Sequence, residues 1–152
     1  MNIYQDKLME YVYNGGTYIV QYNTLGKKYA EPGPYEFKIS RERVTEEDAK
    51  MKLLNSSHPL LNFPNRISEK DFEGWIQERG LYFADKWNEK YEPILEMNDQ
   101  GESPKQGSVL YTEYGDGVFI YTGLSFFREL PAGVPGAYKL FINIISAGKN
   151  IE

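Results

Sequence analysis

The sequence of 152 residues has no cysteine and a single histidine, His58. Without cysteine, the chain has no disulfide, no thiolate zinc ligand and no cysteine nucleophile. One histidine cannot form a His-rich metal site, and a Ser-His-Asp triad within the chain would have to use His58. The chemistry that remains is that of carboxylates, hydroxyls, arginines and aromatic surfaces.

Long apolar runs and excess positive charge are lacking as well. No stretch approaches the ~20 apolar residues that span a bilayer, and the first residues lack the basic and apolar segments of a signal peptide. The 17 Lys and Arg residues are outnumbered by 22 Asp and Glu residues, whereas a nucleic-acid binder needs a basic face. We therefore expect a soluble chain without a membrane or nucleic-acid partner, and its compartment stays open.

The chain length fits a single domain over residues 1–152. Apolar periodicity and turn residues divide the chain into helices and strands. The elements expected first are a helix ending at Asn14–Gly16, a strand at 17–22, a loop at 23–34, an extended piece at 34–39, a helix start at 45–48 and a packed loop at 53–65. They are followed by a short helix that begins at Ser68 and ends at Gly80, strands at 81–84, 93–97, 108–114 and 118–122, and a helix at 137–145. This order predicts an α/β fold with a mixed sheet.

Three arginines, Arg41, Arg43 and Arg128, are candidates for bidentate recognition of a carboxylate or phosphate, with a ligand-free surface charge as the alternative. Arg128 lies in the run that leaves a strand and enters the last helix. Ligand crevices of open α/β sheets form at such points, so the backbone amides from Gly133 to Gly136 are candidates for binding an anion. Ordinary loop chemistry explains the same glycines equally well.

Carboxylates form a second set of candidates, namely Asp71, Glu78, Asp99 and Glu102. Two such groups can hydrolyse a glycosidic bond when they converge at a suitable separation. Glu78 and its neighbour Arg79 also suit a structural ion pair. The turn from Asp99 to Glu102 suits either a loosely bound cation or a plain turn, and the plain turn is favoured because calcium loops carry more oxygen ligands.

His58 precedes a proline and lies among leucines, with no acid or nucleophile close to it in sequence. We therefore expect a loop histidine bonded to the backbone rather than a general base. The tyrosines have two possible roles, a platform for carbohydrate or peptide and half-buried strand positions. They are Tyr11, Tyr13, Tyr18, Tyr22, Tyr82, Tyr111, Tyr114 and Tyr121.

Several long strings of the sequence resemble the C-terminal region of large PIG-L (LmbE-like) deacetylase family proteins. They are Asn14–Asn23, Ser40–Val44, His58–Asn62, Asp71–Phe83, Asn98–Glu102 and Tyr121–Tyr138, so the resemblance covers nearly the whole chain. It implies a class I glutamine-amidotransferase-like domain with a flavodoxin-like layered fold, here truncated at the N-terminus. In such proteins this region follows a zinc-dependent N-acetyl-sugar deacetylase domain.

The chain departs from that family at the catalytic positions. The deacetylase zinc motif is of the Ala-His-Pro-Asp-Asp type, whereas His58 and Pro59 are followed by two leucines. The amidotransferase nucleophile is a cysteine, which this chain lacks. We therefore expect a non-catalytic binding or assembly module beside a carbohydrate deacetylase, without cofactor or metal.

Two further functions stay open, a carboxylate-based hydrolase acting on carbohydrate and an aromatic sugar-binding module. The expected partners are a second copy of the chain, the deacetylase domain and a carbohydrate. A second copy is expected because the strand at 17–22 would otherwise leave a sheet edge uncovered.

Overall fold

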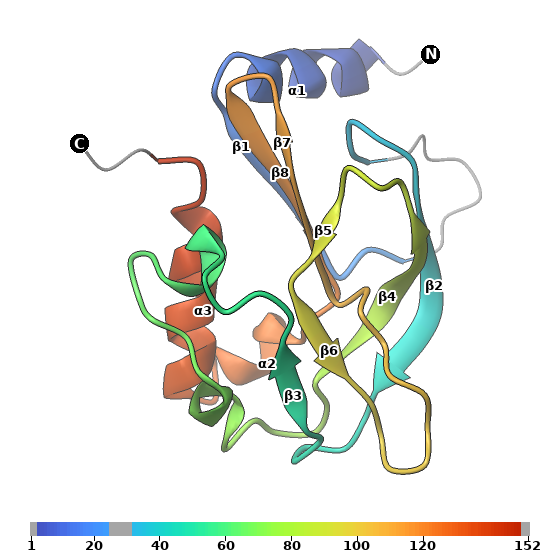
Figure 1. Cartoon of the computed structure of the whole chain (residues 1–152), viewed down its shortest axis with the longest axis vertical. Helices are drawn as coiled ribbons and strands as arrows, with labels where there is room; N and C mark the ends of the chain where they lie inside the picture. The colour runs from blue at the N-terminus through green and yellow to red at the C-terminus, as the bar shows by residue number, and fades with distance from the viewer. Residues whose placement is uncertain (1–2, 25–31, 150–152) are drawn as a thin grey trace.

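A mixed sheet lies at the centre of the computed structural model, which describes residues 3–24 and 32–149 (Figure 1). Its strand order is β1-β8-β7-β5. These strands are β1 (Thr17–Gln21), β8 (Gly117–Thr122), β7 (Val109–Tyr114) and β5 (Glu92–Pro93). β1 runs parallel to β8, and the other neighbours are antiparallel. The α/β character and the mixed sheet predicted from the sequence are confirmed.

Two antiparallel ribbons flank this sheet. The first pairs β2 (Phe37–Val44) with β4 (Gly80–Trp87), and its register shifts between Lys38 and Arg43. The second pairs β3 (Met51–Leu53) with β6 (Leu95–Met97). β2 continues well past the extended piece expected at 34–39, and β3 was not expected at all. A three-residue strand carries too little sequence pattern to be predicted.

The longer helices are α1 (Ile3–Tyr13) and α3 (Pro135–Ile145), and α2 (Phe126–Glu129) is a single turn. Two 3₁₀ segments, η1 (Pro59–Leu61) and η2 (Glu69–Phe72), lie beside α3 (Figure 1). α1 lies against the β7–β8 hairpin, where the amide of Asp116 donates to the carbonyl of Tyr13. None of the helices in the described ranges is long and apolar enough to cross a bilayer.

The residues of β8 alternate between two apolar clusters because successive side chains of a strand point to opposite faces. Val118 and Ile120 belong to the larger cluster, which includes the inward face of α3. Phe119 and Tyr121 belong to the smaller one, together with Phe37 of β2. All residues of β8 are buried. β8 therefore lies at the centre of the fold and contributes side chains to both apolar clusters.

Two helices expected from the sequence are absent from the described residues. The segment at 45–48 is not helical but forms a turn, in which the carboxylate of Asp99 accepts the amides of Thr45 and Glu46. The helix expected from Ser68 is a 3₁₀ turn that ends at Phe72. A capping box of Ser68 and Asp71 is present, but Gly74 and Gln77 have φ of 74° and 62°, which turn the chain away from a helix.

β1 is an edge strand of the central sheet. Among the described residues no further strand pairs with its outer edge. A second copy covering this edge stays a prediction. Part of the loop expected at 23–34 lies outside the described residues.

Candidate functional site

The carboxyl ends of β1 and β8 lie side by side because the two strands are parallel. Tyr22 follows β1 directly, and the segment from Ser125 to Arg128 follows β8. Open α/β sheets bind their ligands at this edge. The residues that gather here form what we call the strand-end cluster: Tyr22, Gln77, Glu78, Tyr82, Phe127 and Arg128.

A chain of polar contacts joins the cluster. The hydroxyl of Tyr22 donates to Glu78 Oε1 at 3.0 Å, and Arg128 Nε donates to the same oxygen at 3.3 Å. Arg128 Nη1 donates to the side-chain oxygen of Gln77. Burial, followed by the hydrogen bond to Glu78, raises the pKa of Tyr22 to about 12. Tyr22 therefore remains a proton donor at neutral pH.

Three aromatic rings surround these polar groups. Tyr22 packs edge-on against Tyr82 and Phe127, with ring centroids 5.4 Å and 4.6 Å away. The guanidinium of Arg128 lies over the ring of Phe127, 4.9 Å from its centroid. Phe127 is 50% exposed. The cluster thus presents an aromatic face and hydrogen-bonding groups on one surface.

The backbone of the cluster is strained. Tyr22, Gln77 and Tyr82 have φ of 49°, 62° and 61°, and within the described ranges they are the non-glycine residues with positive φ. Such a conformation costs about 1–3 kcal/mol per residue and is found preferentially at functional sites. Because all three strained residues belong to the strand-end cluster, the fold places its backbone strain at this one surface.

Buried acceptors and donors hold the segment from Ile76 to Arg79 in place. The carboxylate of Glu129, which is fully buried, accepts the amide of Ile76 at 2.9 Å. The hydroxyl of Ser125 donates to the carbonyl of Glu78 at 2.7 Å. Burial raises the pKa of Glu129, whereas the pKa values of Asp71 and Asp99 are lowered. The sequence did not single out Glu129, whose carboxylate holds the backbone of Ile76 in place.

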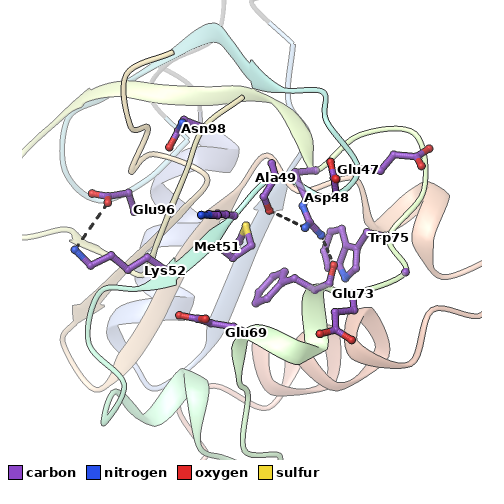
Figure 2. A pocket seen from close by; sticks show the side chains of 14 residues that line it. Glu47, Asp48, Ala49, Met51, Lys52, Glu69, Glu73, Trp75, Glu96 and Asn98 are labelled. Atoms are coloured by element: carbon purple, nitrogen blue, oxygen red, sulfur yellow. Dashed lines mark hydrogen bonds and ion pairs between the residues drawn. The ribbon is translucent and has the colours of Figure 1, made fainter. Parts of the chain in front are cut away.

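A separate pocket, which Arg79 helps to line, lies beside β3 and η2 (Figure 2). Its volume is about 870 Å³, and its walls come from the turn before β3, from β3 and β6, and from η2 and the residues after it. We call it the β3–η2 pocket. The side chains that line it are those of Glu47, Asp48, Ala49, Lys50, Met51, Lys52, Glu69, Phe72, Glu73, Trp75, Arg79, Glu96 and Asn98.

Arg79 lies at the β3–η2 pocket rather than beside Glu78. Its side chain is buried, with 4% of the residue exposed, and its two terminal nitrogens donate to the carbonyls of Ala49 and Phe72. Among the described residues, its Nε has no hydrogen-bond partner. An ion pair between Glu78 and Arg79 was one interpretation of the sequence. In the structure Glu78 pairs with Arg128 instead, and Arg79 ties together two walls of the pocket.

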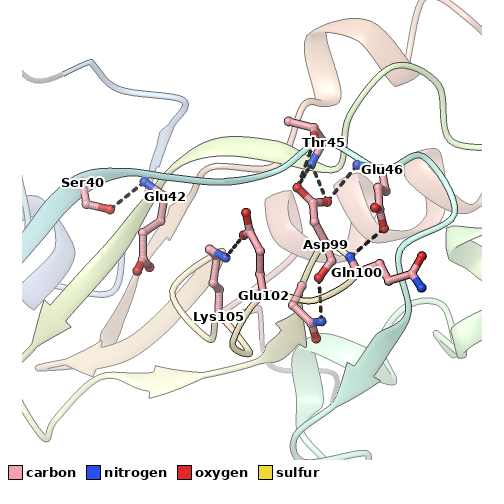
Figure 3. Close-up of polar contacts among 9 residues, drawn as sticks. Ser40, Glu42, Thr45, Glu46, Asp99, Gln100, Glu102 and Lys105 are labelled. Carbon is pink, nitrogen blue, oxygen red and sulfur yellow. Dashed lines mark hydrogen bonds and ion pairs between the residues drawn. The ribbon is translucent and has the colours of Figure 1, made fainter.

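Asp99 has a structural role in the turn after β6 (Figure 3). Its carboxylate accepts the amides of Thr45 and Glu46 and the hydroxyl of Thr45, at 2.9–3.1 Å. Burial favours a higher pKa, but these hydrogen bonds outweigh it and lower the pKa of Asp99. Glu102 is more exposed and pairs with Lys105. In the described part of the chain no three His, Asp or Glu side chains converge to hold a metal ion.

Asp71 forms the capping box of η2 with Ser68 and an ion pair of 2.8 Å with Lys139 of α3. Burial favours a higher pKa, but the contacts with Lys139 and Ser68 outweigh it and lower the pKa of Asp71. The four carboxylates considered for hydrolysis therefore each have their own partners. None of them lines the β3–η2 pocket.

The remaining candidates from the sequence lie apart from both sites. Arg41 and Arg43 are exposed on β2 and form no ion pair with another described residue. The amide of Gly133 already donates to the carbonyl of Leu130. A Cβ on Gly136 would lie 1.7 Å from the carbonyl oxygen of Asp71, so this glycine permits close packing of α3 against η2.

His58 is a loop residue bonded to the backbone, as the sequence predicted, and it is also buried. Its Nδ1 accepts the amide of Leu60 at 3.0 Å, and its Nε2 lies 3.4 Å from a carboxylate oxygen of Glu92. Burial lowers the pKa of His58 in spite of Glu92 and Glu113. The histidine is therefore held neutral between a backbone donor and a carboxylate.

Four members of the strand-end cluster were not among the candidate site residues: Tyr22, Gln77, Tyr82 and Phe127. Tyr22 and Tyr82 were noted only among the possible platform tyrosines. The useful signal was the position of Tyr22 and Phe127 just after the two strands that proved to be parallel. In comparisons with known proteins, no family model and no curated protein matches this chain.

Proposed function

We propose that this chain is a non-catalytic module that binds a neutral carbohydrate at the strand-end cluster. The observation that carries the proposal is the exposed aromatic face of Phe127 beside unused hydrogen-bonding groups. Ligand sites combine apolar and aromatic walls with a few polar groups that fix orientation. Sugars suit such a surface because their ring faces are apolar and their hydroxyls both donate and accept.

Several polar groups of the cluster can form further hydrogen bonds. Glu78 Oε2 is an acceptor, and Gln77 Nε2 and Arg128 Nη2 are donors, and none of the three has a partner among the described residues. A pair of neighbouring sugar hydroxyls matches a set of this kind, because each hydroxyl both donates and accepts. The partly exposed Arg128, with 38% of its side chain accessible, lets a ligand reach the set.

The charge balance of the cluster favours a neutral ligand. Glu78 lies 3.3 Å from Arg128 and offsets its charge. An anion would have to compete with that carboxylate for the guanidinium, whereas a neutral polyol can bond to both groups. The ion pair also orients the guanidinium plane beside Phe127.

Hydrolysis is less well supported than binding. A glycosidase needs two carboxyl groups facing each other across the sugar, with the pKa of one of them raised. In the strand-end cluster Glu78 is the one carboxylate, and the raised pKa in the described chain belongs to Glu129, which bonds the amide of Ile76. The module interpretation needs no second carboxylate.

The wider setting of the module rests on the resemblance to PIG-L proteins. We propose a flavodoxin-like, amidotransferase-related layered fold that works beside an N-acetyl-sugar deacetylase and brings carbohydrate close to it. The mixed sheet with parallel β1 and β8 supports the fold assignment. The open edge of β1 supports assembly with a second copy or with the deacetylase domain.

Isothermal titration of the purified chain with chitin oligosaccharides and peptidoglycan fragments tests the proposal. We expect binding of at least one neutral glycan. Phe127→Ala should weaken it about two- to tenfold, since an aromatic contact contributes roughly 0.5–1.5 kcal/mol. Ile145→Ala is the matched control, because Ile145 has a similar exposure of 46% but lies on α3. Equal affinities of Phe127→Ala and the unaltered chain, or no heat with any glycan, would contradict the proposal.

A further inference from the structure

β1 lies at one edge of the central sheet, beside β8, and its outer side carries a regular row of backbone groups (Figure 1). In a parallel ladder each residue directs its amide and its carbonyl to one side, and the next residue directs them to the other. The amide of Val118 donates to the carbonyl of Gly16 at 3.0 Å, and the amide of Tyr22 donates to that of Thr122 at 2.8 Å. Even-numbered residues therefore face β8. The outward-facing residues of β1 are Thr17, Ile19 and Gln21.

The backbone groups of these outward-facing residues form no hydrogen bond with another described residue. Two other edge strands of the fold carry features that keep a free edge from pairing. β5, the opposite edge of the central sheet, has only two residues, Glu92 and Pro93. β2 has four charged side chains and register shifts between Lys38 and Arg43. Short length, charge, proline and bulges each disfavour the addition of a strand.

β1 has none of these protective features. Its five residues are uncharged and contain no proline, and its pairing with β8 keeps a continuous register. It also combines β-branched and aromatic side chains, which favour pairing. The fold therefore protects β5 and β2 but leaves β1 in a form that accepts another strand.

Both faces of β1 are incompletely covered by the chain itself. Ile19 packs against the larger apolar cluster, where Phe141 and Ala147 of α3 are also only half-buried. Tyr18 and Val20 are half-buried too, and they pack against the smaller cluster on the opposite face. A strand added outside β1 would remove apolar surface from water on both faces, which favours its binding.

A second copy of β1 fits this edge because the outward-facing residues are placed symmetrically about Ile19. A two-fold axis at Ile19 sets this residue opposite Ile19 of the partner subunit, and sets Thr17 opposite Gln21 of the partner subunit. Each such pair exchanges two hydrogen bonds in an antiparallel ladder. The whole chain has a net charge of −5, but β1 is uncharged, so its self-pairing brings no like charges together.

We propose that two copies of this chain pair their β1 strands in antiparallel orientation about a two-fold axis at Ile19 and so join their central sheets. The dimer rests on the assembly role proposed above, for which it supplies the partner. The contact uses the same edge of both copies, so it closes at two copies and does not continue into a fibre. It shares no residue with the strand-end cluster, so its outcome is independent of carbohydrate binding.

Light scattering of the purified chain at micromolar concentration tests for the dimer, and we expect the mass of two chains. Ile19→Lys should reduce this to the mass of one chain, because two lysines would lie opposite each other at the axis. Ile39→Lys is the matched control and should leave the dimer intact. Ile39 is likewise a half-buried isoleucine of an edge strand, but it belongs to β2. Circular dichroism verifies that both variants fold.

A cross-link measures the register of the pair without a charged substitution. The chain has no cysteine, so a single introduced thiol has no other partner within it. Two residues of a hydrogen-bonded antiparallel pair have Cα atoms about 5.5 Å apart, which lies within the range of a disulfide. Under mild oxidation Ile19→Cys should therefore form a covalent dimer, whereas Ile39→Cys should stay a single chain on a non-reducing gel.

Three results would overturn the proposal. The first is an unaltered chain that scatters as a monomer at micromolar concentration. The second is a dimer that persists in Ile19→Lys, because the interface would then lie elsewhere. The third is cross-linking of Ile19→Cys that is no more efficient than that of Ile39→Cys.

Discussion

Replacing Asp99 with asparagine tests whether this carboxylate organises the turn before β3 rather than a ligand. Asp99 is 9% exposed, and both of its oxygens accept hydrogen bonds from Thr45 or Glu46. Asparagine keeps one acceptor oxygen, but its amide group faces the donors of Thr45. The substitution therefore loses the bond from the Thr45 hydroxyl to a charged acceptor and sets the asparagine amide group against the backbone amide of Thr45.

The expected loss is about 2 kcal/mol of unfolding free energy at pH 7. A hydrogen bond to a charged group contributes roughly 1.5–3 kcal/mol. Thr45 and Glu46 are exposed, so water satisfies part of what is lost. For a chain of this size the melting temperature should fall by about 4–8 °C.

The effect should depend on pH in one direction. Because the folded pKa of Asp99 is lowered below its ordinary value of 3.8, its charged form stabilises the fold above that pH. This stabilisation is lost as the pH falls through the lower, folded pKa. The difference between Asp99→Asn and the unaltered chain should therefore be constant from pH 7 to pH 5 and shrink by pH 3.

Thermal unfolding followed by circular dichroism at these pH values provides the measurement. Glu102→Gln is the control in the same turn, because the carboxylate of Glu102 is exposed to water and its pair with Lys105 should contribute less than about 1 kcal/mol. The reasoning would be refuted if Asp99→Asn were as stable as the unaltered chain at pH 7. It would also be refuted if Glu102→Gln lowered the free energy of unfolding as much as Asp99→Asn does.

Two further predictions concern the last helix and the histidine. Gly136→Ala should lower the free energy of unfolding in urea by about 3 kcal/mol or more, because its Cβ would meet the carbonyl of Asp71. Gly133→Ala, where φ is 76° and the space around the glycine is open, should lower it by about 1–2 kcal/mol. Similar losses in the two variants would contradict this packing. The lowered pKa of His58 means that the unaltered chain should lose stability as the pH falls from 7 to 5, below the ordinary pKa of 6.5. His58→Gln should flatten that slope in thermal melts, and parallel slopes would show that another group titrates.

Local patterns in the sequence predicted the elements with strong local signals. α1 and α3 have apolar residues at helical spacing, and the strands expected at 108–114 and 118–122 form the β7–β8 hairpin, which the glycine-containing turn at 115–117 closes. The helix start at 45–48 failed although its hydroxyl cap and acids are present. Asp99, 54 residues away from Thr45, accepts the amides of Thr45 and Glu46 in the turn that forms instead. Local propensity does not include such a long-range contact.

The candidate site was predictable in part. The sequence placed a ligand crevice at the exit of the strand before Arg128, and the strand-end cluster lies there. Its members are far apart in the chain, since Tyr22 and Glu78 are separated by 56 residues. Their convergence depends on β1 pairing in parallel with β8, which no local pattern specifies. The β3–η2 pocket depends in the same way on β3, a strand too short to be predicted.

The most direct test of the central claim is an NMR titration of the ¹⁵N-labelled chain with a neutral oligosaccharide that binds it. The account predicts that the shifted amides concentrate in the strand-end segments, at 22–24, 77–82 and 125–128. At the same ligand concentration Phe127→Ala should reduce these shifts because its affinity is lower, and Ile145→Ala should leave them unchanged. Shifts confined to other surfaces, or a titration of Phe127→Ala identical to that of the unaltered chain, would contradict the claim that this cluster binds carbohydrate.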